Sequence, residues 1–275
     1  MVRLLVYSLW IFISSISSAS AWLQPPRKSE LITKYEYKTI IPNQNSPPFS
    51  FNIYDVFYQY GLNEKITIGL KTQGYNYISS NLANYNNRSK YYIDNDEDAF
   101  TEETESTLYN HYKKSENIPL ETKILAQTKI YSKQNSILSI QPSIIFHSQY
   151  LDKELELRGL YGYNFKLGSE YSYINIEIAG SRRTYKFFAE EADTTSFKLD
   201  LTFALALNKK HTAMFQSFYI YNKALYGNNY YNSGEVSWLY KYNEYLTWQT
   251  GYATNFTHRE QYISQSVITG LWLKF

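Results

Sequence analysis

The chain lacks cysteine altogether and has only two methionines and seven prolines among its 275 residues. Without cysteine, the protein has neither a disulfide framework nor a thiolate metal site. After residue 21 it also lacks any apolar run near the ~20 residues that a helix needs to cross a bilayer, which excludes a helical membrane protein. The formal net charge of +2 is close to neutral and gives no argument for a nucleic-acid partner.

Aromatic residues, in contrast, are abundant: there are 30 tyrosines, 15 phenylalanines and 5 tryptophans, with a mean hydropathy of −0.46. A negative mean hydropathy is compatible with a transmembrane β-barrel, because only alternate residues of each strand face lipid. Tyrosine and tryptophan have an apolar body and one polar end, which suits the interfaces where a barrel leaves the membrane.

The first 21 residues have the features of a secretory signal peptide. Arg3 provides a basic start, residues 4–13 are apolar, and residues 19–21 form an A-x-A cleavage site. The alternative, a membrane anchor, is disfavoured because this apolar run is too short to span the hydrocarbon core. We therefore expect cleavage near Ala21, which leaves residues 22–275 as the mature chain.

The last nine residues alternate as an extended strand does, with one apolar face. A chain that stops on Phe275 within such a strand resembles the closing strand of a bacterial outer-membrane β-barrel, which the barrel assembly machinery of that membrane reads. The expected membrane-insertion signal consists of Val267, Thr269, Leu271, Leu273 and Phe275.

Twelve segments show the alternation of a half-exposed strand. Seven are strong, at residues 54–62, 66–71, 123–130, 174–178, 197–207, 235–242 and 267–275. Five are weaker, at residues 30–40, 137–146, 154–164, 212–221 and 245–254. The sequence therefore predicts an all-β fold, a transmembrane antiparallel barrel of twelve strands.

The connections between these segments alternate between short and long. Short periplasmic turns and longer external loops are typical of an outer-membrane barrel, and an even strand number places both termini in the periplasm. A soluble β-sandwich, the structural alternative, does not explain this alternation. The short connections are residues 62–65, 133–136, 165–167, 208–210 and 243–244, and the long ones are 41–50, 76–120, 147–153, 182–194, 222–229 and 255–261.

The connection at residues 76–120 is unusually long and acidic. Its acidic side chains favour a solvated surface loop. Two alternatives stay open: calcium binding, although the glycine and distant glutamate of an EF-hand are missing, and folding of the loop into the lumen as a constriction. The acidic residues are Asp94, Asp96, Glu97, Asp98, Glu102, Glu103 and Glu105.

The charged residues of the strands fall on the faces opposite the apolar ones. Lys or Arg on a lipid face would cost about 2–4 kcal/mol each at the midplane, so these residues are expected to point inward. With Lys274 they number seven basic and five acidic, which favours a narrow channel for small polar or anionic solutes over a plug of paired charges. The lumen-lining candidates are Asp55, Lys71, Lys123, Lys129, Glu156, Arg158, Glu177, Lys198, Asp200, Glu235 and Lys241.

Catalytic patterns are not convincing in this sequence. A barrel phospholipase needs a serine activated by histidine, but His147 and Ser148 are adjacent and point to opposite faces of a strand. Asp193, His258 and Arg259 do not form a protease constellation, and the four histidines are scattered. We expect no enzymatic activity, no cofactor and no metal.

Five pieces of the chain, taken in order, resemble XagA-like outer-membrane proteins. Residues 21–26 (AWLQPP) resemble their AWxxP opening, and residues 60–70 (YGLNEKITIGL) resemble their YGLTDRLTLGL turn. Residues 136–142 (SILSIQP), 156–162 (ELRGLYG) and 270–275 (GLWLKF) follow in the matching order. The resemblance implies an outer-membrane barrel associated with surface glycans and biofilm, without a catalytic motif that transfers to this chain.

Three functions remain as hypotheses. The first is a narrow channel for small polar or anionic solutes. The second is a non-catalytic surface protein in adhesion, biofilm or glycan handling, and the third is a lipid-modifying enzyme that uses His147 and Ser148. The expected partners are outer-membrane lipid and lipopolysaccharide, the barrel assembly machinery, and a small polar solute or glycan.

Overall fold

The computed structural model describes residues 21, 23–41, 49–78, 120–148, 152–168, 170–187, 190–224, 227–257 and 263–275. The signal-peptide prediction and the acidic residues from Asp94 to Glu105 lie outside these residues. Cleavage near Ala21, calcium binding and a lumen constriction therefore stay predictions. Within the described residues, no helix is long and apolar enough to cross a bilayer.

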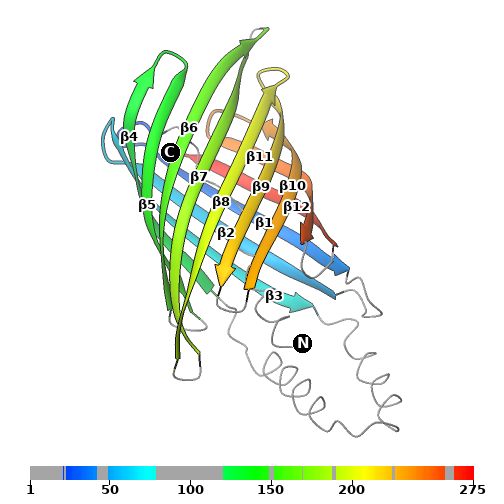
Figure 1. The fold of residues 1–275 in the computed structure, drawn as a ribbon. Helices are drawn as coiled ribbons and strands as arrows, with labels where there is room; N and C mark the ends of the chain where they lie inside the picture. Colours follow the sequence, from blue (N-terminus) through cyan, green and yellow to red (C-terminus); the bar gives the residue numbers. More distant parts are fainter. Residues whose placement is uncertain are drawn as a thin grey trace, which may run out of the picture.

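Twelve antiparallel strands form one closed barrel in which each strand pairs with its sequence neighbours and β1 pairs with β12 (Figure 1). All twelve predicted strands are present, so the predicted fold class is confirmed. The strands are β1 (Ser29–Ile41), β2 (Phe49–Gly61), β3 (Ile66–Ile78), β4 (Leu120–Lys133), β5 (Ser136–His147), β6 (Asp152–Leu167), β7 (Glu170–Phe187), β8 (Glu190–Ala206), β9 (His211–Ala224), β10 (Gly227–Lys241), β11 (Leu246–Thr257) and β12 (Ile263–Lys274).

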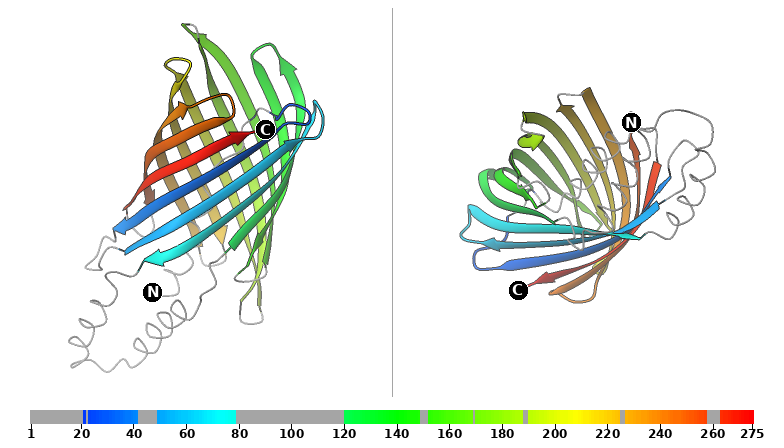
Figure 2. Two further views of the ribbon diagram at one scale, coloured as in Figure 1. Left: turned by 180° about the vertical axis from the view of Figure 1, so that it is seen from behind. Right: turned by 90° about the horizontal axis from the view of Figure 1, so that it is seen from below.

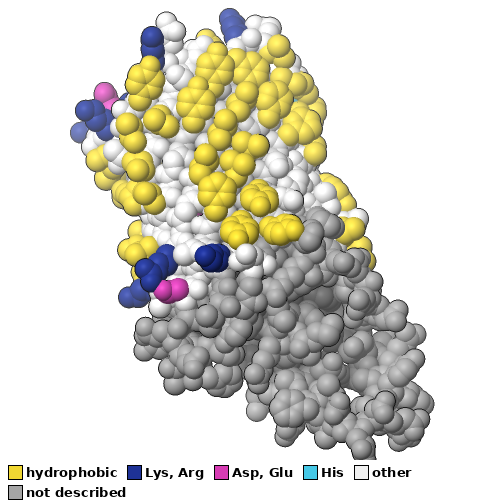
Figure 3. All heavy atoms as spheres, in the orientation of Figure 1, with side chains coloured by type: hydrophobic (Ala, Val, Ile, Leu, Met, Phe, Trp, Pro, Cys, Tyr) yellow, Lys and Arg dark blue, Asp and Glu magenta, His cyan; other side chains and the backbone are white. Residues whose placement is uncertain are grey.

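Burial alternates residue by residue along the strands, as the period of two requires. In β6, Leu155 and Leu157 are 62% and 54% exposed, whereas the intervening Glu156 is 4% exposed. Figure 3 shows apolar side chains over much of the outer wall, with basic side chains towards its two ends. The apolar face of each strand is thus the outer face, and the charged face is the inner one.

The barrel closes between its first and last strands. The pairing of β1 with β12 runs from Glu30 opposite Lys274 to Ile41 opposite Ile263. Phe275 continues this ladder, because its amide donates to the carbonyl of Ser29 at 2.9 Å and its carbonyl accepts from the amide of Ser29 at 3.2 Å. Closure leaves no unpaired edge, which is a requirement for a sheet surrounded by lipid.

The short turns at the end of the barrel that holds Phe275 reuse one local device. The side-chain oxygen of Asn63 accepts hydrogen bonds from the amides of Lys65 and Ile66, at 2.8 and 3.0 Å. Asn208 and Asn243 make the same pair of bonds two and three residues ahead. An asparagine that replaces a backbone partner in this way specifies a tight turn, which confirms the predicted short connections.

At the opposite end, two predicted long loops are wrong. Strand β7 ends at Phe187 and β8 begins at Glu190, and β9 ends at Ala224 and β10 begins at Gly227. Residues 182–194 and 222–229 are therefore mostly strand. The predicted loops begin where the apolar alternation ends, whereas the backbone ladders continue as far as Phe187 opposite Glu190 and Ala224 opposite Gly227.

The strands fall into two walls that cross at an angle. Figures 1 and 2 show β4–β9 running steeply, while β12 and β1–β3 cross behind them obliquely. Apolar side chains of the two walls meet inside the barrel. One such cluster joins Ile40, Phe51 and Ile53 of the oblique wall to Ile220 and Tyr231 of β9 and β10.

Trp272 of β12 makes a second connection between the walls. Its ring packs against a cluster of Ile32, Phe57 and Leu125, and also against a cluster that contains Met214 and Leu239. The interior between β1–β2 and β9–β10 is therefore filled by side chains. An open path would have to follow the remaining wall, from β3 to β8.

Candidate functional site

Strand β6 places four charged side chains in succession on the inner face of that remaining wall. Asp152, Glu154, Glu156 and Arg158 occupy alternate positions of β6 and are all buried. The outward positions between them hold Lys153, Leu155 and Leu157. The inner face of β6 is thus a line of ionisable groups inside the barrel.

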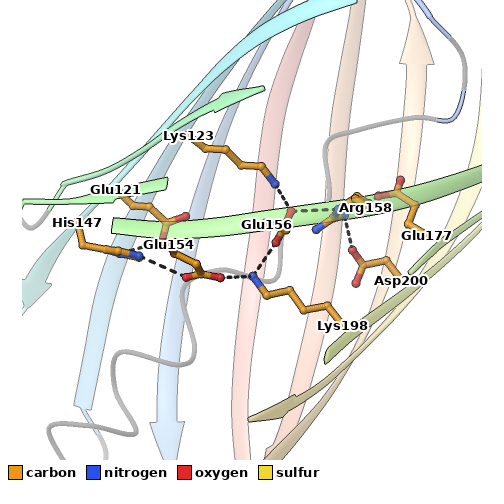
Figure 4. A network of polar contacts seen from close by, with 9 residues as sticks. All are labelled: Glu121, Lys123, His147, Glu154, Glu156, Arg158, Glu177, Lys198 and Asp200. Carbon is orange, nitrogen blue, oxygen red and sulfur yellow. Dashed lines mark hydrogen bonds and ion pairs between the residues drawn. The ribbon is translucent and has the colours of Figure 1, made fainter. Parts of the chain in front are cut away.

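Glu156 is the centre of an ionic network that joins β6 to its neighbours (Figure 4). One carboxylate oxygen accepts from Lys123 Nζ of β4 at 2.6 Å, and the other accepts from Lys198 Nζ of β8 at 2.8 Å. Arg158 Nε contacts the first of these oxygens at 3.3 Å. Glu156 therefore has three cationic partners, which compensate the loss of hydration of its charge.

The network continues from Arg158 along β7 and β8. Arg158 Nη1 donates to Glu177 at 2.6 Å and to Asp200 at 2.8 Å. Because charge-assisted hydrogen bonds of this length are the strong class, they fix the guanidinium against the wall. Glu177 lies on the neighbouring strand β7, whereas the contact with Asp200 on β8 skips a strand, as do the contacts of Glu156 with Lys123 and Lys198. The charges therefore line the curved wall and do not merely pair along one ladder.

The network also reaches His147 of β5, towards the end of the barrel opposite Phe275. We call this end the outer-loop end. Lys198 Nζ contacts Glu154 at 3.1 Å, and Glu154 lies 3.4 Å from His147 Nε2. His147 Nδ1 is 3.7 Å from Glu121 of β4. Arg183 Nη2 of β7 pairs with Asp152 at 2.7 Å. A line of paired charges therefore runs along this wall from Asp152 to Arg158 of β6.

A separate contact crosses the barrel. Lys34 Nζ of β1 lies 2.8 Å from Glu235 of β10, although β11 and β12 separate these strands in the sheet. Glu235 also accepts from Gln249 at 3.0 Å, and Gln249 in turn accepts from Trp272 at 3.0 Å. This contact narrows the interior on the side away from β6.

The segment before β1, residues 23–28, folds against the inside of the barrel at the short-turn end, and we call it the N-terminal strap. Leu23 packs on the buried Ile137 and Leu160. The amide of Gln24 donates to Thr67 at 3.0 Å, and its side chain donates to Glu30 at 3.1 Å. Just before the strap, the carbonyl of Ala21 accepts from Gln127 and Ser139.

Sequence reasoning missed the strap. The signal that could have found it is Gly61, the last residue of β2, which forms an isolated bridge with Pro26. A Cβ at Gly61 would collide with the carbonyl oxygen of Pro25 and would lie 2.6 Å from that of Gln24. A glycine at a strand end often marks such a close backbone approach.

Most of the predicted lumen residues lie together inside the barrel. Lys129 is only partly buried beside the β-bulge of β4, and Lys241 is exposed at the end of β10. Whether any of them lines a conducting path stays a prediction. The nine that are buried on the inner face are Asp55, Lys71, Lys123, Glu156, Arg158, Glu177, Lys198, Asp200 and Glu235.

The structure adds interior charges that the sequence analysis did not select, and the added set changes the balance. Among the described residues, nine carboxylates are buried but only six lysines and arginines, so the basic majority of the sequence count is reversed. Two reasons apply: Lys241 and Lys274 are exposed and Lys129 is only partly buried, and β6 contributes Asp152 and Glu154. The inner face of β1, which sequence reasoning missed, adds two acidic and two basic residues and leaves the balance unchanged. The added residues are Glu30, Lys34, Glu36, Lys38, Asp152 and Glu154.

The predicted insertion signal lies on the outer face of β12. Val267, Leu271 and Phe275 are 58%, 43% and 59% exposed, and Thr269 accepts a hydrogen bond from Trp248 of β11. Leu273 is partly buried on the same face. These positions present an apolar surface outward, while recognition by an assembly machinery stays a prediction.

The residues considered for lipase chemistry do not come together. His147 points inward between two glutamates, whereas Ser148 lies exposed in the turn after β5. Within the described ranges, there is also no group of three histidine, aspartate or glutamate side chains arranged to hold a metal ion. Asp193, considered for protease chemistry, pairs with Arg182 at 2.5 Å, and His258 and Arg259 lie outside the described residues.

Comparison with solved structures finds barrels of the same kind. The COG4313 outer membrane channel from Pseudomonas putida F1 aligns with a TM-score of 0.61 at 10% identity, over 94% of this chain and 100% of that chain. The NanC porin aligns with a TM-score of 0.58 at 8% identity, over 88% and 100%. At such low identity, these similarities show the fold alone.

Comparisons of the sequence itself give no further assignment. No protein-family model matches the chain, and no curated protein matches it. The resemblance to XagA-like proteins therefore stays a prediction.

Proposed function

We propose that this protein is a narrow channel of the bacterial outer membrane that passes small polar solutes. The observation that carries the proposal is the line of inner charges on β4–β8, which lies inside a barrel whose outer face is apolar. Charged side chains in a membrane-spanning protein face an aqueous cavity or pair with one another, and they commonly mark a solute pathway. Here they form a connected line on one wall, whereas apolar packing and the pair of Lys34 with Glu235 occupy the opposite side.

Polar groups beside this line support an aqueous interior. Within the described part of the chain, the side-chain amides of Gln73 and Gln141 are buried without a hydrogen-bond partner. Gln73 pairs in the sheet with Asp55 and Glu121, and Gln141 is opposite Arg158. Because buried amides are almost always satisfied, water or a polar solute beside this wall accounts for them.

The bore is narrow for two reasons. Twelve strands give a lumen between the filled eight-stranded barrels and the open porins of sixteen or more. The contact between Lys34 and Glu235 and the packing of Trp272 then occupy one side of that lumen. The similarity to solved structures named as an outer membrane channel and a porin supports the same reading.

The charge balance favours neutral or cationic solutes over anionic ones. Acidic side chains outnumber basic ones among the buried residues, and a ring or line of carboxylates favours cations in a pore. The expectation of anionic solutes from the sequence counts Lys241 and Lys274 as inward residues, and both are exposed. A role in surface-glycan handling rests only on the family resemblance and stays a prediction.

Planar-bilayer recording of the purified mature protein tests the proposal. We expect discrete conductance steps and, in a salt gradient, a reversal potential on the cation-selective side. The control is the same preparation after heat unfolding. A preparation that shows the compact gel mobility of a folded barrel, yet conducts at no voltage, would contradict a channel.

A further inference from the structure

The outer wall of the barrel carries a hollow where a closed barrel would be convex. The hollow has a volume of about 1110 Å³ and extends across β2–β8. This is at or above the upper end of the ~300–1,000 Å³ typical of small-molecule sites. Its lining is apolar and comes from the outward positions of these strands, including Tyr58, Ile68, Leu70, Ile124, Ile144 and Leu155.

The strand register explains why the wall is hollow here. One row of directly opposed outward residues is bulky and runs from Tyr58 through Leu70, Ile124, Ile144 and Leu155. Two residues further along three of the strands, the outward positions are small. Their residues, Ala126 of β4, Pro142 of β5 and Gly180 of β7, lie in the floor of an oblique trough, and Leu157 of β6, which is 54% exposed, stands between Pro142 and Gly180 in the same row.

Gly180 leaves the floor of the trough open at its own position. A Cβ built on Gly180 would meet no atom within 4 Å, so the glycine is not required by a close contact. Beyond the floor the outward residues are bulky again, with Ile178 on β7 opposite Leu199 on β8. The trough therefore has an apolar floor and two raised apolar sides, all on the face that would meet lipid.

One end of the trough is cationic. The bulky row ends at Arg182, which is opposite Leu155 and has a side chain that is 68% exposed. The guanidinium of Arg182 donates a hydrogen bond to Asp193. The hydroxyl of Thr184 donates to the other carboxylate oxygen of Asp193 and so fixes the position of this pair. Lys153, two residues beyond Leu155 on β6, is exposed opposite Thr184. Two cations and one carboxylate thus lie at the outer-loop side of the trough.

We propose that this trough binds a phosphorylated glycolipid of the outer leaflet, the lipid part of lipopolysaccharide, with acyl chains in the trough and a phosphate on Arg182 and Lys153. The inference rests on the proposed membrane location. Arginine and lysine bind phosphate by charge-assisted hydrogen bonds, and acyl chains fill an apolar groove without a polar cost. The cationic end lies at the outer-loop side, which is the side that would meet the outer leaflet.

A second copy of the chain is a poorer occupant of the trough. It would have to cover the exposed Arg182 and Lys153, whose charges exceed the single charge of Asp193. A phosphorylated lipid complements both the apolar floor and this net positive end.

The test measures lipid binding to the delipidated full-length mature protein in detergent by native mass spectrometry. The probes are purified lipopolysaccharide, the same lipid after enzymatic dephosphorylation, and phosphatidylglycerol. The variants are Gly180→Leu, which fills the trough, and the double variant Lys153→Gln with Arg182→Gln, which removes its cations. The matched control is Gly234→Leu, because Gly234 is an outward glycine of β10 with equally open surroundings.

We expect lipopolysaccharide to bind at least about tenfold more weakly to the double variant, since one charge-assisted contact is worth that much or more. It should also bind more weakly to Gly180→Leu, because the leucine occupies space that the acyl chains would fill. The Gly234→Leu variant should bind like the wild type, and the dephosphorylated lipid should bind as weakly as the double variant. Equal binding of the phosphorylated and dephosphorylated lipids would overturn the proposal, as would equal binding of phosphatidylglycerol or a dimer that forms without lipid.

Channel recording on the same variants separates this inference from the proposed function. Gly180→Leu changes only the outer face, so its conductance and its heat-modifiable mobility should equal those of the wild type. A barrel that conducts but binds no lipopolysaccharide overturns the lipid site alone. A folded barrel that binds lipopolysaccharide but does not conduct overturns the channel alone.

Discussion

At the scale of single residues, Glu156 has the greatest electrostatic consequence. Its carboxylate contacts Lys123, Lys198 and Arg158. The Glu156→Gln variant keeps the shape but leaves three cations with fewer counter-charges. Breaking a buried ion pair from one side costs about 3–5 kcal/mol, and water in the lumen would screen part of this. We expect a lower unfolding temperature in gel-mobility assays and a shift of the reversal potential towards anions.

An exposed acidic residue provides the control for that variant. Glu244 lies in the turn before β11 and is exposed, so Glu244→Gln should change the stability by no more than ~0.5 kcal/mol. If Glu156→Gln and Glu244→Gln behave alike in both assays, the inner network has neither a structural nor an electrostatic role.

The alternation of side chains along a strand predicts most of the inner charges. A charged side chain between two outward apolar neighbours must face the inside of the barrel. The inner face of β1 was missed, although Lys34, Glu36 and Lys38 alternate there. The outward partners of these residues include Tyr35 and Tyr37, which are polar on a hydropathy scale. The difference in hydropathy between the two faces of β1 is therefore too small to identify the inner face, even though the tyrosine rings suit a membrane interface.

At the scale of elements, β12 carries a prediction about assembly. Deleting Phe275 removes two backbone hydrogen bonds to Ser29, each worth about 0.5–1.5 kcal/mol net. We expect refolding into detergent to continue, while the amount of barrel in the outer membrane of cells falls several-fold. Membrane fractionation measures this, and a Phe275→Tyr variant should assemble normally. An unchanged amount of barrel in the outer membrane after deletion of Phe275 would show that the assembly machinery does not recognise the terminal aromatic residue.

The N-terminal strap provides the second prediction at this scale. Gly61→Ala places a methyl group against the Pro25 carbonyl, and such overpacking costs about 1–3 kcal/mol. The strap should detach from Ile137 and Leu160, so that a protease cleaves within residues 23–28 faster and the conductance rises. Gly234→Ala, with no atom within 4 Å of the new methyl group, is the control.

An unchanged conductance together with faster proteolysis of Gly61→Ala would mean that the strap does not restrict the pore.

The strap also shows why sequence alone could not complete the site. A contact between residues 23–28 and strands β2, β5 and β6 depends on where the closed sheet brings those strands. No local pattern of alternation specifies that position.

The two extended hairpins, β7–β8 and β9–β10, illustrate a different limit at the element scale. Sequence reading equated the end of apolar alternation with the end of the strand. The backbone ladder instead continues, for example from Ser181 opposite Ser196 to Phe187 opposite Glu190. Hydropathy reports where the lipid ends, whereas hydrogen bonding determines where the strand ends.

At the scale of the whole molecule, the proposed function depends on which side chains face outward and which face inward. The proposed channel requires that the closed sheet present apolar side chains to lipid and charged ones to an aqueous interior. The number and order of strands followed from the sequence, because alternation is local. The filling of one side of the lumen did not, because the contacts of Trp272 and Lys34 cross between strands far apart in the sheet.

The absence of cysteine makes a direct measurement possible. Single cysteines would replace three inward residues and, in separate variants, one outward neighbour of each. The protein would be reconstituted in membranes and treated with a charged, membrane-impermeant thiol reagent during channel recording. The pairs are Ser143 with Ile144, Thr202 with Leu201, and Lys71 with Leu70, whose exposed fractions are 6% and 41%, 8% and 41%, and 7% and 45%.

We predict that the charged reagent modifies the three inward cysteines and reduces the conductance. The three outward cysteines should react only with a lipid-soluble reagent and leave the conductance unchanged. Equal reactivity of the two sets, or reaction of the outward set with the charged reagent, would contradict an aqueous interior surrounded by a lipid-facing wall.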